Sequence, residues 1–182
     1  MTRIPTIETK EQVPPEGRAA YDLIVKSRGG VRGPFTVLLH SPEFAARASE
    51  LGAYVRFESK FPTREKEVVI LAAAREVDCR FEWAAHVEMA RKAGVREEAI
   101  AAIRDRRAPK GLTAEEALLV AYVQQLLRVH RVDEPTFRAM QERFGLELLV
   151  ELTGAIGYYA LLACALNAFD VTPEPGAELL PV

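Results

Sequence analysis

The segment from residue 63 to residue 94, TREKEVVILAAAREVDCRFEWAAHVEMARKAG, predicts two helices with a break at Asp78. A helical period of about 100° per residue places Glu67 on an apolar stripe of the first helix, with Glu65 and Arg75 off that stripe. In the second helix one face combines apolar and ionisable residues: Cys79, Glu82, Trp83, His86, Met89, Ala90 and Ala93. Two carboxylates, an imidazole and a thiol are therefore expected to point into mostly apolar surroundings.

This placement of ionisable groups is the main functional signal in the chain. A buried carboxylate is costly unless it is hydrogen-bonded, paired or protonated. A single histidine on an apolar helix face is more often structural than catalytic. The joint placement of Glu67, Glu82 and His86 on buried stripes instead favours a functional site.

The rest of the sequence predicts an all-α fold, because no stretch alternates apolar and polar residues as a strand would. We expect roughly seven or eight helices joined by short loops. Residues 1–14 predict an extended arm, because Pro5 and Pro14 disfavour regular helix there. Residues 15–182 are then expected to form a single helical domain.

Signals for helix ends support this division of the chain. Ser41 precedes Pro42 as an N-cap, for a helix to about residue 59, and Gly94 is placed as a C-terminal stop. Thr113-Ala-Glu-Glu116 matches a capping box for a helix to about residue 130. Two further helices are expected, one capped by Asp133 and ended by Gly145, and the other over residues 146–169.

Composition narrows the function classes. The 182 residues carry a formal net charge of −2, so no overall positive field favours nucleic acid or acidic membranes as partners. Two cysteines make no disulfide framework, and the N-terminal residues lack the apolar core of a signal peptide, which favours a cytoplasmic location. Residues 152–169 are uncharged and long enough to be a membrane-span candidate. Their alanine, glycine and tyrosine content instead predicts a buried core or subunit-interface helix.

The order of Glu67, Cys79, Glu82 and His86 resembles the carboxymuconolactone decarboxylase and AhpD-like (alkylhydroperoxidase) superfamily. The AhpD motif is a glutamate, then CxxC, then a histidine four residues after the second cysteine. Cys79 matches the first cysteine, Glu82 stands where the second would be, and Glu67, twelve residues before Cys79, matches the relay glutamate. The stretches 93–100 (AGVREEAI) and 157–171 (GYYALLACALNAFDV) also resemble family members. The resemblance covers roughly residues 35–171 and implies an AhpD-like helical domain.

The resemblance implies enzymatic chemistry, and the replaced cysteine changes which chemistry is expected. With Glu82 in the second position, a two-thiol peroxidase cycle cannot run through CxxC. Cys164 would resolve an oxidised Cys79 only if the fold placed the two together. Glu82 and His86, four residues apart on one helix, favour general acid–base chemistry instead.

The leading hypothesis is a decarboxylase-like or related lyase acting on a small carboxylated ring or lactone. In it His86 is the general acid and base, Glu67 and Glu82 tune or relay protons, and Cys79 lines the pocket. The main alternative is a one-thiol (hydro)peroxidase, in which a helix start at Cys79 favours the thiolate. No cofactor is expected.

Three further alternatives stay open. Cys79, Glu82 and His86, with Glu67 as a fourth ligand, have the chemistry of a metal site. A degenerate family member would keep the assembly without activity. The resemblance also implies a homo-oligomer (dimer, trimer or hexamer). Tyr158 and Tyr159 are candidates for a pocket or for interface packing, and interface packing is the expected use.

Overall fold

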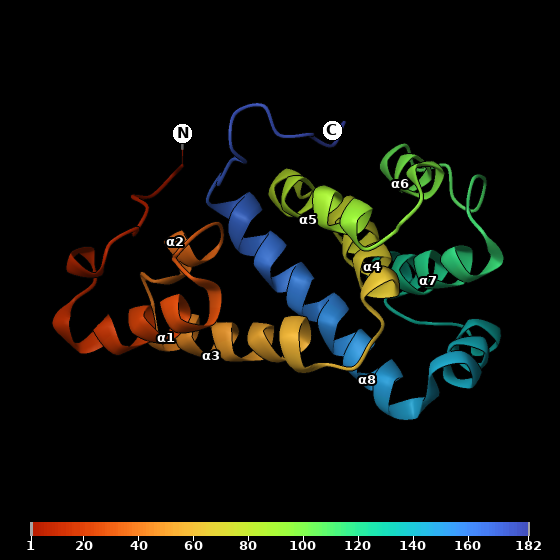
Figure 1. The fold of residues 1–182 in the computed structure, drawn as a ribbon, viewed down its shortest axis with the longest axis horizontal. Helices are drawn as coiled ribbons and strands as arrows, with labels where there is room; N and C mark the ends of the chain where they lie inside the picture. The colour runs from red at the N-terminus through yellow and green to blue at the C-terminus, as the bar shows by residue number, and fades with distance from the viewer. Residues whose placement is uncertain (1, 182) are drawn as a thin grey trace. The chain divides into compact units, whose positions relative to one another are not determined.

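The computed structural model describes residues 2–181, which contain helices, turns and irregular segments but no β-strand. Eight α-helices follow one another along the chain (Figure 1). The all-α prediction is therefore confirmed. The chain divides into two compact units, one of residues up to Ser59 with Leu161–Thr172, the other of Lys60–Ala160 with the residues from Pro173 onward. The expected arm of residues 1–14 and single domain of residues 15–182 stay a prediction.

Helix α4 is the centre of the second unit, where it packs against α5, α6 and α7 (Figure 1). The helices of this unit are α4 (Thr63–Glu76), α5 (Arg80–Lys92), α6 (Glu97–Arg104), α7 (Ala114–Gln124), the π-helical turn η4 (Gln125–Val129) and the first part of α8 (Glu134–Ala168). Because neighbours cover α4 on all sides, every residue from 65 to 75 is buried.

Glu65 and Arg75, which helical periodicity places off the apolar stripe of α4, are both buried as well. An ion pair offsets each burial: Arg64 contacts Glu65 at 2.9 Å between Nη2 and Oε1, and Arg75 pairs with Asp78. The apolar stripe in the sequence could not predict the burial of these two residues, because helical periodicity identifies one packed face and α4 has several.

The hydrophobic core of the second unit draws on all of its helices. Trp83 of α5 is fully buried in it, as expected for a core residue. Its other large, fully buried members are Leu71, Ile100, Leu119, Met140, Leu149, Leu152 and Ile156. The core therefore holds α4 and α5 side by side, which is what positions the ionisable residues of both helices.

The predicted helix ends in this unit are confirmed. Gly94 follows α5 with a φ of 86°, and Gly145 interrupts α8 with a φ of 77°. The Thr113 hydroxyl accepts a hydrogen bond from the Glu116 backbone N–H (3.3 Å). The Asp133 carboxylate accepts one from the Thr136 backbone N–H (2.8 Å).

The first unit packs α1 (Arg18–Arg28) against α3 (Pro42–Ala53), with α2 (Phe35–Leu38) beside α3. Two short 3-10 turns, η1 (Lys10–Gln12) and η2 (Pro15–Gly17), precede α1. The π-helical turn η3 (Tyr54–Glu58) extends α3 nearly to the predicted end at residue 59. Ser41 takes the N-cap position of α3, but its side chain makes no capping hydrogen bond.

Within residues 2–181, α8 is the one helix long and apolar enough to cross a membrane by length and composition. Half of its most apolar 18-residue window is buried. A core helix passes the same test as a membrane helix. The expected role of residues 152–169 as a core or interface helix, the absence of a membrane partner and the cytoplasmic location all stay predictions.

Candidate functional site

A tight turn between α4 and α5 sets the geometry of the candidate site. Asp78 occupies the left-handed region with a φ of 48°, which an aspartate tolerates better than most residues. Its carboxylate pairs with Arg75 and accepts hydrogen bonds from Arg106 Nη2 at 2.9 and 3.0 Å. The Cys79 backbone N–H donates to the Ala74 carbonyl at 2.8 Å. The turn is thus held from both sides, and α5 returns along α4.

The returning helix places the His86 imidazole between two carboxylates. Nδ1 of His86 lies 2.9 Å from Oε2 of Glu67, within hydrogen-bond distance. Nε2 of His86 lies 3.6 Å from Oε2 of Glu82, one helical turn earlier on α5. The side chains of His86, Glu67 and Glu82 are only 5%, 10% and 5% exposed. The structure therefore brings three of the four predicted site residues together in a buried cluster, which we call the Glu–His–Glu cluster.

Cys79, the fourth predicted residue, starts α5 two turns before His86. It occupies the N-cap position, as the sequence predicts for a helix start, and it is fully buried. Its backbone carbonyl accepts a hydrogen bond from the Trp83 N–H at 3.1 Å. Cys79 and Cys164 are both free thiols; Cys164 is exposed on the part of α8 that belongs to the first unit. The structure thus shows no disulfide between them.

Tyr159, one of the two tyrosines that the sequence analysis assigns to a pocket or an interface, lies beside the cluster. The ring of Tyr159 lies perpendicular to the His86 imidazole, at 90° and 5.1 Å between ring centroids. Tyr158 and Tyr159 are both 3% exposed, which leaves little of either side chain for a partner, and their expected use in interface packing stays a prediction. Tyr159 lies on α8, far from His86 in sequence, and no spacing pattern links the two.

The candidate metal site finds no geometric support. Among residues 2–181 no group of three or more His, Cys, Asp and Glu side chains is arranged to hold a metal ion. Glu67 and Glu82 face different nitrogens of His86, so their oxygens and the imidazole nitrogens do not converge on one point.

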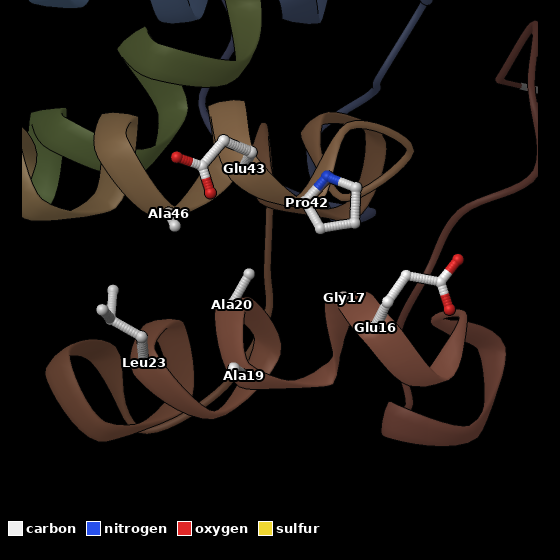
Figure 2. A pocket seen from close by; sticks show the side chains of 8 residues that line it. All are labelled: Glu16, Gly17, Ala19, Ala20, Leu23, Pro42, Glu43 and Ala46. Atoms are coloured by element: carbon white, nitrogen blue, oxygen red, sulfur yellow. The ribbon is translucent and has the colours of Figure 1, made fainter.

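A separate hollow of about 370 Å³ lies in the first unit, between α1 with its preceding turn and α3 (Figure 2). Ala20 and Leu23 of α1 face Pro42 and Ala46 of α3 across it, as Figure 2 shows. Its remaining lining residues are Glu16, Gly17, Ala19 and Glu43. It contains none of the four predicted site residues, and the Glu43 carboxylate is paired with Arg47 at 2.6 Å.

The helical arrangement is an AhpD-like fold. A structure from Ralstonia eutropha JMP134, an alkylhydroperoxidase AhpD core described as an uncharacterised peroxidase-related protein, aligns with a TM-score of 0.76 at 16% identity. That alignment covers 96% of this chain and 93% of the other. A putative antioxidant defence protein AhpD from Agrobacterium tumefaciens aligns with a TM-score of 0.68 at 21% identity, over 79% and 99% of the two chains.

A third similar structure is a variant of the debrominase Bmp8 in complex with 2,3,4-tribromopyrrole. It aligns with a TM-score of 0.73 at 14% identity, over 96% of this chain and 93% of the other. At these identities the three structures establish the fold and leave the substrate open. No curated protein sequence matches this chain significantly.

Residues 42–125 match the carboxymuconolactone decarboxylase family, and this segment contains Glu67, Cys79, Glu82 and His86. The predicted resemblance to the carboxymuconolactone decarboxylase and AhpD-like superfamily is thereby confirmed. The matched segment is narrower than the expected range of residues 35–171. The equivalence of Glu82 with the second cysteine of CxxC stays an inference from the sequence.

Proposed function

We propose that the chain is an acid–base enzyme of the carboxymuconolactone decarboxylase type, acting on a small carboxylated or lactone substrate. One observation carries the proposal: a single buried imidazole lies between two buried carboxylates. Such a set transfers protons to and from a substrate without a metal or redox group. Family membership at the level of a carboxymuconolactone decarboxylase or AhpD-like protein agrees with an enzyme-like function.

In this proposal the two nitrogens of His86 have different roles. Nδ1 is within hydrogen-bond distance of Glu67, so this bond orients the ring and selects its tautomer. Nε2 is 3.6 Å from Glu82, too far for a hydrogen bond, and is therefore the nitrogen free to exchange a proton with a substrate. Glu67 is then a positioning residue, and His86 is the catalytic residue.

In this proposal Glu82 completes the proton balance. When a substrate loses CO2, the electron pair of the broken bond stays on carbon, and the Nε2–H of a protonated His86 delivers a proton there. The net proton that decarboxylation consumes comes from solvent water, and Glu82, on the same side of the ring, relays it to Nε2 for the next turnover. In lactone isomerisation Nε2 removes a proton from one carbon and delivers it to another, so no net proton is needed.

A one-thiol peroxidase is the second candidate, and the position of Cys79 at the start of α5 favours it. Cys79 is the N-cap residue of α5, and the dipole at a helix N-terminus favours a thiolate. The thiolate would attack one peroxide oxygen, releasing an alcohol and leaving a sulfenic acid, which an external thiol then reduces. Cys79 is completely buried and His86 is nearly so, so burial does not separate the two candidates.

The deciding experiment compares wild type, His86→Gln and Cys79→Ser in two assays. One assay follows CO2 release or isomerisation of carboxylated lactones, and the other follows consumption of organic hydroperoxide with a thiol reductant. We expect His86→Gln to lower kcat for the lactone by about 100-fold or more, because general acid–base catalysis contributes about that much. Cys79→Ser should retain the lactone activity.

The opposite pattern, with peroxide consumption lost in Cys79→Ser, would replace the proposal with the peroxidase. Activity in neither assay, over a panel of such substrates, would favour a non-catalytic family member. Glu82→Gln adds a check on the roles, since it should lower kcat without changing the fold, whereas Glu67→Gln should also disturb the imidazole orientation.

A further inference from the structure

The perpendicular contact between Tyr159 and His86 joins α8 to the Glu–His–Glu cluster. We propose that Tyr159 is a positioning residue, whose ring holds the His86 imidazole with Nδ1 at Glu67 and Nε2 toward Glu82. This inference rests on the proposed function, because it concerns the orientation that proton transfer at Nε2 requires. The ring centroids are 5.1 Å apart at 90°, a geometry that aromatic pairs prefer.

The cluster alone leaves the imidazole incompletely held. The torsion that turns a histidine ring about its Cβ–Cγ bond has broad minima, so packing has to select the ring orientation. The hydrogen bond to Glu67 restrains one edge of the ring. Glu82 lies beyond hydrogen-bond distance of Nε2 and does not restrain the other edge. A perpendicular aromatic ring restrains the imidazole in the direction that neither carboxylate does.

Tyr159 is itself held firmly enough to impose this orientation. Its ring makes a second perpendicular contact with Tyr158, at 5.6 Å between centroids and 79°. Both tyrosines are 3% exposed. They follow Leu152 and Ile156 on α8, which are members of the core of the second unit. The position of Tyr159 is therefore restrained by contacts besides the one with His86.

Nuclear magnetic resonance of the imidazole tests the proposal without needing the substrate. The chain has three histidines, and His40 and His130 are exposed. Because Nε2 of His40 also lies 2.8 Å from the Pro5 carbonyl oxygen, the slowly exchanging imidazole N–H is assigned to His86 by its loss in His86→Gln. Wild type should also show nuclear Overhauser contacts between the ring protons of His86 and Tyr159.

We expect Tyr159→Leu to raise the exchange rate of the His86 N–H by about two- to tenfold, the factor that corresponds to the usual strength of an edge-to-face pair. Tyr159→Phe keeps the ring and should keep the wild-type rate. Phe144→Leu is the matched control, because it removes one ring from the Phe61–Phe144 pair (4.9 Å) in the same unit. It should leave the His86 N–H unchanged.

Three results would overturn the proposal: an unchanged exchange rate in Tyr159→Leu, a raised rate in Tyr159→Phe, or a rise of the same size in Phe144→Leu. If Tyr159→Leu does not fold, as judged by circular dichroism, the wild-type ring contacts and Tyr159→Phe still decide. Measuring wild-type turnover of lactones beside the exchange rate distinguishes a failure of this proposal from a failure of the proposed function. A raised exchange rate in Tyr159→Leu, with a wild type inactive on every lactone, removes the function and keeps the positioning role. A wild type that is active on a lactone, together with an unchanged exchange rate in Tyr159→Leu, keeps the proposed function and removes the positioning role.

Discussion

His86 obtains its surroundings from three helices, since Glu67 lies on α4, Glu82 on α5 and Tyr159 on α8. A structural histidine in a core needs one hydrogen-bond partner, which Glu67 alone supplies. The second carboxylate, that of Glu82, is buried 3.6 Å from the other nitrogen, and its burial adds a further desolvation cost. That excess of ionisable groups is the physical reason to prefer a functional cluster at this residue.

Gly17 gives a prediction about stability at a single residue. A Cβ at this position would lie 2.5 Å from Cγ and 2.8 Å from Cβ of Pro42, and a proline ring cannot rotate out of the way. We expect Gly17→Ala to lower the free energy of unfolding by about 1–3 kcal/mol, as overpacking usually does. Urea denaturation measures the change.

Two variants serve as controls for Gly17→Ala. At Gly30 an added Cβ would meet only Arg32 Nε, at 3.9 Å, so Gly30→Ala should be nearly neutral. Pro42→Ala removes Cγ, so combining it with Gly17→Ala should recover part of the loss. A neutral Gly17→Ala would show that α1 and α3 separate readily.

At the scale of secondary structure, Glu116 secures the start of α7 and its link to Arg96. The carboxylate accepts hydrogen bonds from the Thr113 backbone N–H at 2.8 Å and from Arg96 Nε at 3.2 Å. Burial acts to raise the pKa of Glu116. The hydrogen bonds from Arg96 and Thr113 outweigh this effect and lower the pKa below its usual value of 4.5.

Glu116 therefore predicts a pH dependence of stability. A lowered pKa in the folded chain means that the carboxylate contributes stability above pH 4.5, and that this contribution is lost as the pH falls through the folded pKa. We expect Glu116→Gln to lower the free energy of unfolding by about 2 kcal/mol at pH 7, and by less at pH 3. Urea denaturation at both pH values is the measurement.

Glu98→Gln is the matched control for this prediction. Glu98 is 3.7 Å from the same Arg96, but its side chain is 71% exposed, so its loss should change stability little. An equal effect of the two substitutions would assign the stability to the charge of Arg96 and not to the capping of α7.

At the scale of the whole molecule, α8 presents an exposed apolar stripe within the second unit. Leu146 and Val150 are 59% and 63% exposed. Gly154 and Gly157 continue the stripe at a spacing of four and three residues, and a Cβ at either would meet nothing within 4 Å. Small residues along such a stripe let another helix approach closely. This observation supports the homo-oligomer expected from the sequence, in which a second copy covers the stripe.

We therefore expect the wild type to be an oligomer in light scattering coupled to size-exclusion chromatography, and Val150→Glu to dissociate it. A charge in a closely packed interface is costly to desolvate. Val129→Glu is the control, because Val129 is equally exposed (65%) but lies on η4 and outside the stripe. A monomeric wild type, or equal dissociation by both substitutions, would contradict the prediction.

Much of the fold could be predicted from local sequence signals. Helix boundaries near Gly94, Thr113, Asp133 and Gly145 follow from interactions within a few residues of each position, and these persist in the folded chain. The same holds for the proximity of Glu82 to His86, since a spacing of four residues on one helix suffices to bring them together.

Contacts between distant segments depended on the packing of whole helices. The hydrogen bond from Glu67 to His86 required the Asp78 turn to return α5 along α4. The burial of Glu65 and Arg75 required neighbours around all of α4, and the contact of Tyr159 with His86 required α8. Helical periodicity describes which residues share a face, whereas the choice of the helix that covers that face depends on how the core is packed as a whole.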